Sequence, residues 1–163
     1  MRGNSASGKS TVARRVQESF PKGMVAVVGQ DLLRREVLKV GDGPDNPAIS
    51  LIDTVARHAL DAGFHVVVEG ILHAPYYGVM LRALVADHAG TSAAFRWELS
   101  FDETVRRHAT KPQAAEYGPD LMRRWWTDHD PLSGVHEVEF DAAVTADQAV
   151  ARVRGAFDWP SRL

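Results

Sequence analysis

The sequence lacks cysteine altogether, and it also lacks any long apolar run. The absence of cysteine excludes disulfide bonds and thiol chemistry, and it is typical of proteins from a reducing compartment. No apolar stretch approaches the roughly 18 residues that span a bilayer, and the polar residues 1–11 do not resemble a signal peptide. We therefore expect a cytoplasmic protein without a membrane partner.

The sequence also lacks an excess of positive charge. Its formal net charge is −2, which gives no electrostatic reason to bind bulk nucleic acid. Its histidines show no metal-ligand spacing, and no N-K-x-D motif for guanine is present. With 45% hydrophobic and 25% charged residues, the composition is that of an ordinary globular protein and predicts one domain over residues 1–163.

What the sequence does contain is a phosphate-binding loop near its start. Residues 3–10 follow the pattern G-x-x-x-x-G-K-S, in which glycines allow a tight turn and successive N–H groups form an anion nest. In this pattern Lys9 reaches the β- and γ-phosphates, and the Ser10 hydroxyl ligates Mg²⁺. The alternative is a solvated tail rich in glycine and serine. The predicted nucleotide-binding residues are Gly3, Asn4, Ser5, Ala6, Ser7, Gly8, Lys9, Ser10 and Thr11.

The strand that usually leads into such a loop is missing or truncated. A P-loop follows a buried strand, yet only Met1 and Arg2 precede Gly3. Three explanations are open: a misassigned start codon, a truncated chain, or a fold that tolerates a gap or borrows a strand. The first two are favoured, and they predict that this form is less stable than its fold suggests.

Strand and helix signals alternate along the rest of the chain. Continuous apolar runs predict buried parallel strands, and apolar residues at helical spacing predict the helices between them. This alternation favours an α/β fold with helices on both faces of a parallel sheet. The predicted strands are 24–28, 65–69, 92–99 and 138–140. The predicted helices are 11–20, 31–38, 48–62, 76–88, 101–108, 120–127 and 146–157.

Charged residues follow several of these strands. Asp31 comes shortly after the first predicted strand, and Glu69 closes the second. Arg107 and Lys111 follow the third strand through a helix. Because ligands of open α/β sheets bind at the carboxyl ends of the strands, we expect these side chains and the phosphate loop to surround one cleft.

The order of these elements resembles that of the small P-loop kinases, the AAA_33 group. The resemblance rests on the phosphate loop, the D-x-x-R element at 31–34, the E-G pair at 69–70 and the cationic helix that follows, and it covers about residues 3–157. That group includes nucleoside and nucleotide kinases, chloramphenicol phosphotransferases and polynucleotide kinase domains. The resemblance implies a three-layer P-loop NTPase fold with sheet order 2-3-1-4-5, ATP and Mg²⁺ as cofactors, and a lid at about residues 107–124.

The same resemblance suggests roles for three residues near the expected substrate site. Asp31 is the candidate catalytic base for the attacking hydroxyl, with a helix N-cap as the alternative. Arg34 lies one helical turn later on the same face, where it is placed to hold an anionic or hydroxylated substrate. Glu69 either contacts substrate hydroxyls, orients Mg²⁺ through water, or forms a structural salt bridge. We predict that Asp31, Arg34 and Glu69 bind the substrate.

Two cations on the predicted lid complete the catalytic set. Arg107 and Lys111 are four residues apart and share a helix face. They are expected to stabilise charge on the transferring phosphoryl group as an arginine finger in cis does. A solvated basic face is the alternative. The predicted catalytic residues are Lys9, Asp31, Arg107 and Lys111, and the predicted metal ligand is Ser10.

The sequence thus favours an ATP-dependent phosphotransferase that moves the γ-phosphoryl group of ATP to a hydroxyl of a small molecule. The alternatives are a regulatory or degenerate ATP-binding protein and a 5′-hydroxyl polynucleotide kinase, which the net charge disfavours. Residues 40–50 and 71–78 are expected to shape the acceptor pocket, and they carry no recognised motif. Nucleoside, nucleotide, sugar and antibiotic acceptors therefore all stay open, as does the oligomeric state.

Overall fold

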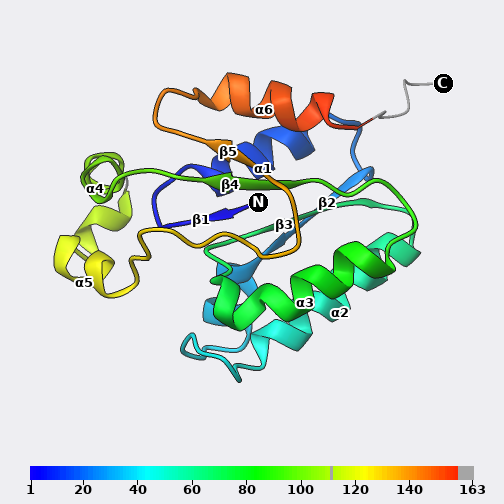
Figure 1. Ribbon diagram of the computed structural model, residues 1–163, viewed down its shortest axis with the longest axis horizontal. Helices are drawn as coiled ribbons and strands as arrows, with labels where there is room; N and C mark the ends of the chain where they lie inside the picture. The colour runs from blue at the N-terminus through cyan, green and yellow to red at the C-terminus, as the bar shows by residue number, and fades with distance from the viewer. Residues whose placement is uncertain (111, 158–163) are drawn as a thin grey trace.

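The computed structural model describes residues 1–110 and 112–157 as parallel strands covered by helices on two faces. Figure 1 shows α1 and α6 on one face of the strands and α2 and α3 on the other. The strands are β1 (Arg2–Gly3), β2 (Val25–Gly29), β3 (His65–Glu69), β4 (Ala94–Trp97) and β5 (Glu137–Phe140). The α-helices are α1 (Lys9–Glu18), α2 (Ala48–Asp61), α3 (Ala74–Asp87), α4 (Phe101–His108), α5 (Pro119–Arg124) and α6 (Ala146–Gly155).

The strands form two parallel groups that meet at β1. One group pairs β2 with β3, and the other has the order β1-β4-β5. A single parallel bridge between Arg2 and Gly70 connects β1 to the end of β3. The complete order is therefore 2-3-1-4-5, and the sequence-based prediction of an α/β fold with this order is confirmed.

The first strand is present, but it is only two residues long. Arg2 pairs with Arg96, and Gly3 pairs with Trp97. On the other side the amino group of Met1 donates a 2.8 Å hydrogen bond to the carbonyl of Val68. The register of these pairs aligns the start of the phosphate loop with the carboxyl ends of both neighbouring strands.

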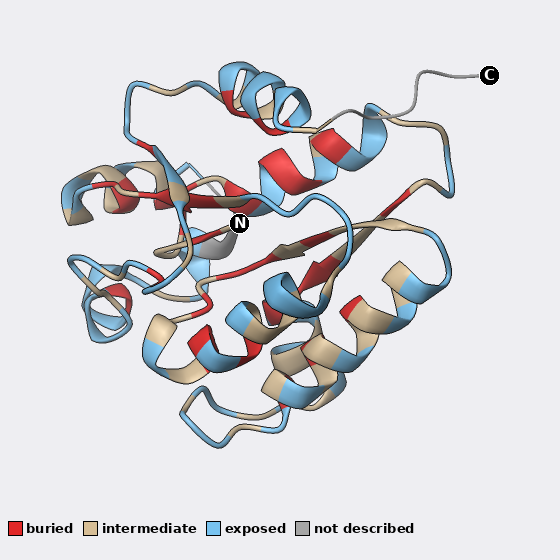
Figure 2. Cartoon of the chain, turned by 45° about the vertical axis from the view of Figure 1, so that its right-hand side comes forward, coloured by how far each residue is buried: buried red, intermediate tan, exposed pale blue. Residues whose placement is uncertain are grey.

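Two apolar clusters hold the layers together, and their buried residues are red in Figure 2. The first packs α1 and α6 against one face, and it includes Val12 and Val16 of α1 and Phe95 of β4. The second packs α2 and α3 against β2 and β3 through residues such as Ile52 and Tyr77. The first cluster contains residues of both strand groups, whereas the second includes no residue of β4 or β5 among those described.

Buried arginines anchor β1 and β4 beside the loop. The Arg2 guanidinium pairs with Glu137 at 2.6 Å and with Asp130 at 3.1 Å, and it donates a 2.7 Å hydrogen bond to the carbonyl of Leu72. Arg96 is only 3% exposed and pairs with Glu139, among other carboxylates. Because an unpaired buried charge is costly, these ion pairs explain why arginine is tolerated in a central strand.

Several predicted element bounds differ from the structure. The predicted helix at 31–38 is a π-helix, η1 (Leu32–Val37), in which the N–H of Leu38 bonds to the carbonyl of Leu33 five residues earlier. The predicted helix at 120–127 begins one residue earlier and ends at Arg124, because the chain turns at Trp125. A short 3₁₀ helix, η2 (Pro112–Ala115), lies in the predicted lid.

Candidate active site

The phosphate loop has the backbone geometry that its glycines predict. Gly3 has φ +140°, and a Cβ there would lie 2.7 Å from the carbonyl oxygen of Trp97. Gly8 has φ +104°, and Ala6 between them is also left-handed at φ 60°. These positive φ values are the ones that favour glycine, so the loop turns back on itself directly before α1.

Lys9 folds its side chain into this loop. Its ammonium donates a 2.7 Å hydrogen bond to the carbonyl of Asn4 and a 3.0 Å hydrogen bond to the hydroxyl of Ser7. The Lys9 residue is 6% exposed. A buried cation held among loop backbone groups at the start of a helix is an arrangement that favours bound anions.

A segment that follows α5 also forms hydrogen bonds with the phosphate loop. The Asn4 side chain donates a 2.7 Å hydrogen bond to the carbonyl of Thr127, and it accepts one of 3.1 Å from the Thr127 N–H. Thr127 lies just beyond α5, so this pair joins the phosphate loop to the segment that follows the predicted lid. The sequence did not reveal this contact, because the two residues are 123 positions apart.

Ser10 and Glu69 meet beside the loop. The Ser10 hydroxyl donates a 2.8 Å hydrogen bond to Oε2 of Glu69. Glu69 is the last residue of β3, where it pairs in register with Gly29 of β2. A Cβ on Gly29 would lie 3.1 Å from the other carboxylate oxygen of Glu69, so glycine at this position leaves room for the carboxylate. The structure therefore brings Ser10 and Glu69 into contact, as the expected cleft requires.

Asp31 and Arg34 lie at the same edge of the strands, two and five residues beyond Gly29. The Asp31 side chain is 62% exposed and pairs with the Arg34 guanidinium at 3.1 Å. Arg34 is more enclosed and also donates a 3.3 Å hydrogen bond to the carbonyl of Val40. Asp31 occupies the N-cap position of η1, but its side chain makes no capping hydrogen bond there.

Arg107 reaches the phosphate loop from α4. It donates a 3.1 Å hydrogen bond to the carbonyl of Ser7 and a 3.2 Å hydrogen bond to the carbonyl of Ala142, beyond β5. Glu103, one turn earlier, holds its guanidinium at 2.6 Å. Hydrogen bonds from Arg106 and then Arg107 lower the pKa of Glu103 to about 2, so this carboxylate stays charged. Lys111, the second predicted cation, lies outside the described residues.

The helix α4 is capped at its start by Ser100. The Ser100 hydroxyl accepts a 3.3 Å hydrogen bond from the N–H of Glu103, as an N-cap does. The Glu103 carboxylate is occupied by two arginines instead of reaching back to Ser100. The first turn of α4 therefore serves to orient Arg107.

A polar cluster centred on Gln30, a residue that the sequence did not single out, lies beyond the end of β2. Gln30 is 1% exposed, and its amide donates a 3.2 Å hydrogen bond to Asp42 while accepting one of 3.0 Å from the N–H of Leu72. The Tyr77 hydroxyl donates a 2.8 Å hydrogen bond to Asp42 and accepts one of 3.3 Å from Asn46. Burial, followed by the contact with Asp42, raises the pKa of Tyr77 to about 12. Asp42, Asn46 and Tyr77 lie within residues 40–50 and 71–78, which the sequence predicts to shape the acceptor pocket, whereas no motif pointed to Gln30.

Comparison with known structures identifies the fold. APS kinase CysC of Mycobacterium tuberculosis, solved in complex with AMPPNP and APS, matches with a TM-score of 0.66 and 21% identity over 95% of this chain and 93% of that one. A gluconokinase from Sinorhizobium meliloti 1021 matches with a TM-score of 0.66 and 20% identity over 95% of this chain and 87% of that one. No known family profile and no curated protein sequence matches. The predicted resemblance to P-loop kinases is thus confirmed for the fold.

Proposed function

We propose that this protein transfers the γ-phosphoryl group of ATP to a hydroxyl of a small molecule. The observation that carries the proposal is the joining of Lys9, Ser10 and Glu69 at one loop: a buried ammonium inside the loop and a hydroxyl hydrogen-bonded to a carboxylate beside it. In the proposal the ammonium binds the phosphates of ATP, and the hydroxyl with its carboxylate partner binds the Mg²⁺ that accompanies them.

The residues present fit Mg²⁺. Magnesium prefers oxygen ligands and is usually held by one or two protein groups together with substrate phosphates. The Ser10 hydroxyl is exposed at the first turn of α1, and the Glu69 carboxylate is 2.8 Å away. We assign Ser10 as the ligand and Glu69 as the group that orients it, which favours the metal-orienting role of Glu69 over substrate contact. When bound, Mg²⁺ would neutralise phosphate charge.

The acceptor is assigned to the edge that carries Asp31. In the proposal Asp31 accepts the proton of the attacking hydroxyl, and its exposed carboxylate is free of any capping bond that would hold it against the helix. Phosphoryl transfer has a loose transition state, so orientation of the hydroxyl matters more than the basicity of the carboxylate. Arg34, next to it, is assigned to hold the acceptor.

The lid cations are assigned to the phosphate chain. Arg107 already contacts the carbonyl of Ser7, and a bound phosphate would offer it a charged acceptor in place of a neutral one. Lys111 is assigned the same task. We also propose a lid function for about residues 107–124, which the Asn4–Thr127 contacts would connect to the loop.

The experiment that tests the proposal measures ATP binding by calorimetry with and without Mg²⁺, followed by a screen of hydroxyl acceptors for ADP release. We expect Lys9→Ala to weaken ATP binding by about 10- to 100-fold, because a hydrogen bond to a charged group contributes about 1.5–3 kcal/mol. Lys22→Ala is the matched control, since Lys22 is exposed and lies beyond α1. Thermal melting of both variants shows whether they fold.

The outcomes separate the candidate functions. ADP release that depends on an acceptor supports a small-molecule kinase, and the acceptor that works identifies its substrate class. ATP binding with slow hydrolysis and no acceptor effect would instead show a regulatory nucleotide-binding protein. Unchanged ATP affinity in Lys9→Ala would contradict the assignment of the loop.

A further inference from the structure

The loop at residues 40–47 is held against the end of β2 by Gln30 and Arg34, which lie on either side of the candidate base in the chain. The Gln30 amide donates a 3.2 Å hydrogen bond to Oδ2 of Asp42. The Arg34 guanidinium donates one of 3.3 Å to the carbonyl of Val40. The loop therefore borders the edge to which the acceptor is assigned.

Gln30 is itself fixed by the turn between β3 and α3. Its Oε1 accepts a 3.0 Å hydrogen bond from the N–H of Leu72. Leu72 has a left-handed backbone at φ 48°, which is uncommon outside glycine, and its carbonyl accepts a 2.7 Å hydrogen bond from Arg2. A Cβ on Gly70 would overlap the Gln30 side chain, so glycine there leaves the space that the amide occupies. Because Oε1 is engaged by Leu72, the amide nitrogen faces Asp42.

This position requires an amide. The Leu72 N–H needs an acceptor and the Asp42 carboxylate needs a donor, and a glutamine side chain offers one of each on its two polar atoms. Gln30 is 1% exposed, and a buried polar group that loses its partner is costly. The amide therefore cannot rotate away from one partner without also giving up the other.

The Asp42 carboxylate divides its contacts between its two oxygens. Oδ1 accepts hydrogen bonds of 2.8 Å from the Tyr77 hydroxyl, 3.1 Å from the Asn46 amide and 3.1 Å from the Gly43 N–H. Oδ2 accepts the hydrogen bond from Gln30. Asp42 is exposed, whereas Tyr77 and Gln30 are buried. These contacts therefore attach an outer loop residue to two buried side chains.

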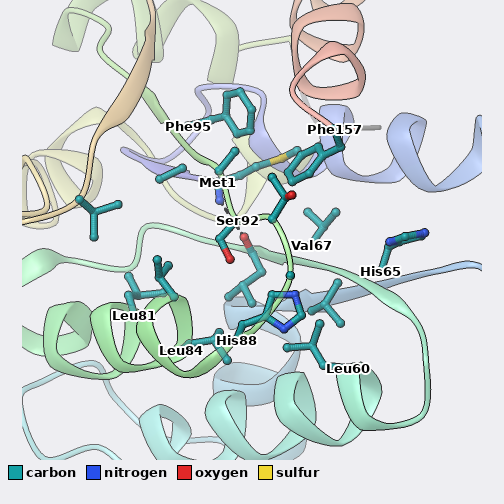
Figure 3. A pocket seen from close by; sticks show the side chains of 18 of the residues that line it. Met1, Leu60, His65, Val67, Leu81, Leu84, His88, Ser92, Phe95 and Phe157 are labelled. Carbon is teal, nitrogen blue, oxygen red and sulfur yellow. Dashed lines mark hydrogen bonds between the residues drawn. The ribbon is translucent and has the colours of Figure 1, made fainter. Parts of the chain in front are cut away.

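The polar cluster is separate from a large apolar cavity that lies between β3 and β4. That cavity, shown in Figure 3, has a volume of about 530 Å³, and Leu72 is among the residues that line it. Gln30, Asp42 and Tyr77 do not line it. The contacts of Gln30 therefore belong to the polar end of β2, where the acceptor is assigned.

We propose that Gln30 is a positioning residue for the acceptor site, because its amide holds Asp42, and with it the loop at residues 40–47, in the arrangement that shapes the acceptor pocket. The inference rests on the proposed phosphoryl transfer, and it assigns Gln30 no contact with the acceptor itself. Loss of the Gln30–Asp42 hydrogen bond should raise the KM for the acceptor. The Kd for ATP, which depends on the phosphate loop, should stay unchanged.

The test reverses the polarity of this hydrogen bond. Gln30→Glu keeps the acceptor for Leu72 but replaces the donor with an oxygen that faces Asp42. Asp42→Asn places a second donor opposite the Gln30 amide, because Tyr77 and Asn46 keep the amide oxygen of the variant on their side. The double variant Gln30→Glu/Asp42→Asn sets an acceptor opposite a donor and so restores the bond. All of these changes preserve the size of the side chains.

We expect each single variant to raise the KM for the acceptor by about tenfold or more, because a hydrogen bond to a charged group is lost. The double variant should return the KM to within about threefold of that of the parent chain, which is the sign of a direct interaction in a double-mutant cycle. Gln17→Glu is the matched control. Gln17 donates a 2.9 Å hydrogen bond to the carbonyl of Val25 at the opposite end of β2, so this variant should leave the KM unchanged.

The pH profile supplies a signature that a merely structural role would not produce. Burial and the charge of Asp42 both raise the pKa of a carboxyl introduced by Gln30→Glu. While that carboxyl is protonated, its O–H can donate to Asp42 as the amide does. The KM of Gln30→Glu relative to the parent should therefore rise with pH, whereas the double variant should improve with pH.

Trypsin cleavage after Lys39 reports the attachment of the loop without any enzyme assay, because Lys39 is exposed directly before it. Cleavage should be faster in both single variants and as slow as in the parent in the double variant. If Gln30→Glu does not fold, as thermal melting would show, Tyr77→Phe removes the other buried donor to Asp42 and should raise the KM in the same way.

The outcomes separate this inference from the proposed function. A parent chain without acceptor-dependent ADP release would overturn the proposed phosphoryl transfer, and the role of Gln30 with it. An active parent whose single variants keep the parental KM would overturn the role of Gln30 alone. So would a double variant that is as impaired as the single variants in KM and in trypsin cleavage.

Discussion

The Ser10 hydroxyl donates a hydrogen bond to Glu69 across 2.8 Å, although the two residues are 59 positions apart in the chain. Ser10 lies in the first turn of α1, and Glu69 is the last residue of β3. The contact therefore joins the proposed metal ligand to a carboxylate. The sequence predicted that both residues lie at the carboxyl ends of the strands, but it did not predict that they touch. One variant of Glu69 can therefore distinguish its possible roles, which are Mg²⁺ orientation, substrate contact and a structural salt bridge.

We predict that Glu69→Gln raises the Mg²⁺ concentration needed for half-maximal activity by about 10- to 100-fold, the usual cost of losing a group that orients a metal ligand. Glutamine keeps an acceptor for Ser10 but removes the charge. Mg²⁺ titrations of ADP release, with the acceptor that the screen identifies, measure this effect. Glu36→Gln, an exposed change on η1, is the control. If Glu69 contacts the acceptor instead, the variant will raise the KM for the acceptor and leave the Mg²⁺ requirement unchanged.

We predict that Asp31→Asn lowers kcat by about 10²-fold, which is the scale of general base contributions, while the Kd for ATP stays unchanged. The variant keeps the size of the side chain, so its partner Arg34 has little reason to move. Steady-state kinetics and calorimetry supply the two measurements, and Asp61→Asn, at an exposed aspartate at the end of α2, is the control. Parallel losses of ATP affinity and turnover would remove Asp31 from the role of base.

Arg107→Lys is predicted to weaken ATP binding by about tenfold or more, because lysine cannot form the planar set of contacts that arginine makes with the Ser7 and Ala142 carbonyls. Arg106→Lys is a closely matched control. Arg106 pairs with the same Glu103 carboxylate but is 69% exposed. Calorimetry on the two variants therefore isolates the contacts to the loop, and equal affinities would mean that Arg107 is only part of a solvated basic face.

The buried amino group of Met1 predicts a pH-dependent stability. Its pKa is about 5 in the folded chain and 8.0 in the absence of burial. Between these pH values the unfolded chain binds a proton that the folded chain does not, so the free energy of unfolding rises with pH from about 5 to about 8. The contribution is complete above pH 8 and is lost below about pH 5. Urea unfolding across this range measures it.

N-terminal acetylation provides the control for that prediction, because an acetylated Met1 carries no titratable amine. Its unfolding curve should depend less on pH than that of the free chain, with the two curves converging toward high pH. Parallel pH profiles for the two forms would mean that other groups cause the change.

The sequence predicted the parts of this protein that follow from local pattern. The G-x-x-x-x-G-K-S spacing located the loop, and the apolar runs located β2 and β3 with little error. The π-helix at Leu32–Val37 could not be predicted, because its backbone bonds span one residue more than those of an α-helix while its sequence pattern is the same. Nor could the Gln30–Asp42 contact, which depends on how the loop at residues 40–47 folds back over β2.

Because β1 is short, the strand layer consists of two strand groups with a narrow connection between them. One group contains β2 and β3, and the other contains β4 and β5. Within the strand layer, β1 connects the two groups. The phosphate loop follows β1 directly. Ser10 connects the loop to Glu69 of the first group by a hydrogen bond, and Arg107, which follows β4 in the chain, donates a hydrogen bond to the loop at Ser7. A nucleotide bound in the loop would therefore stabilise the contact between the two strand groups. We expect it to slow their local separation, including in parts that the nucleotide does not touch.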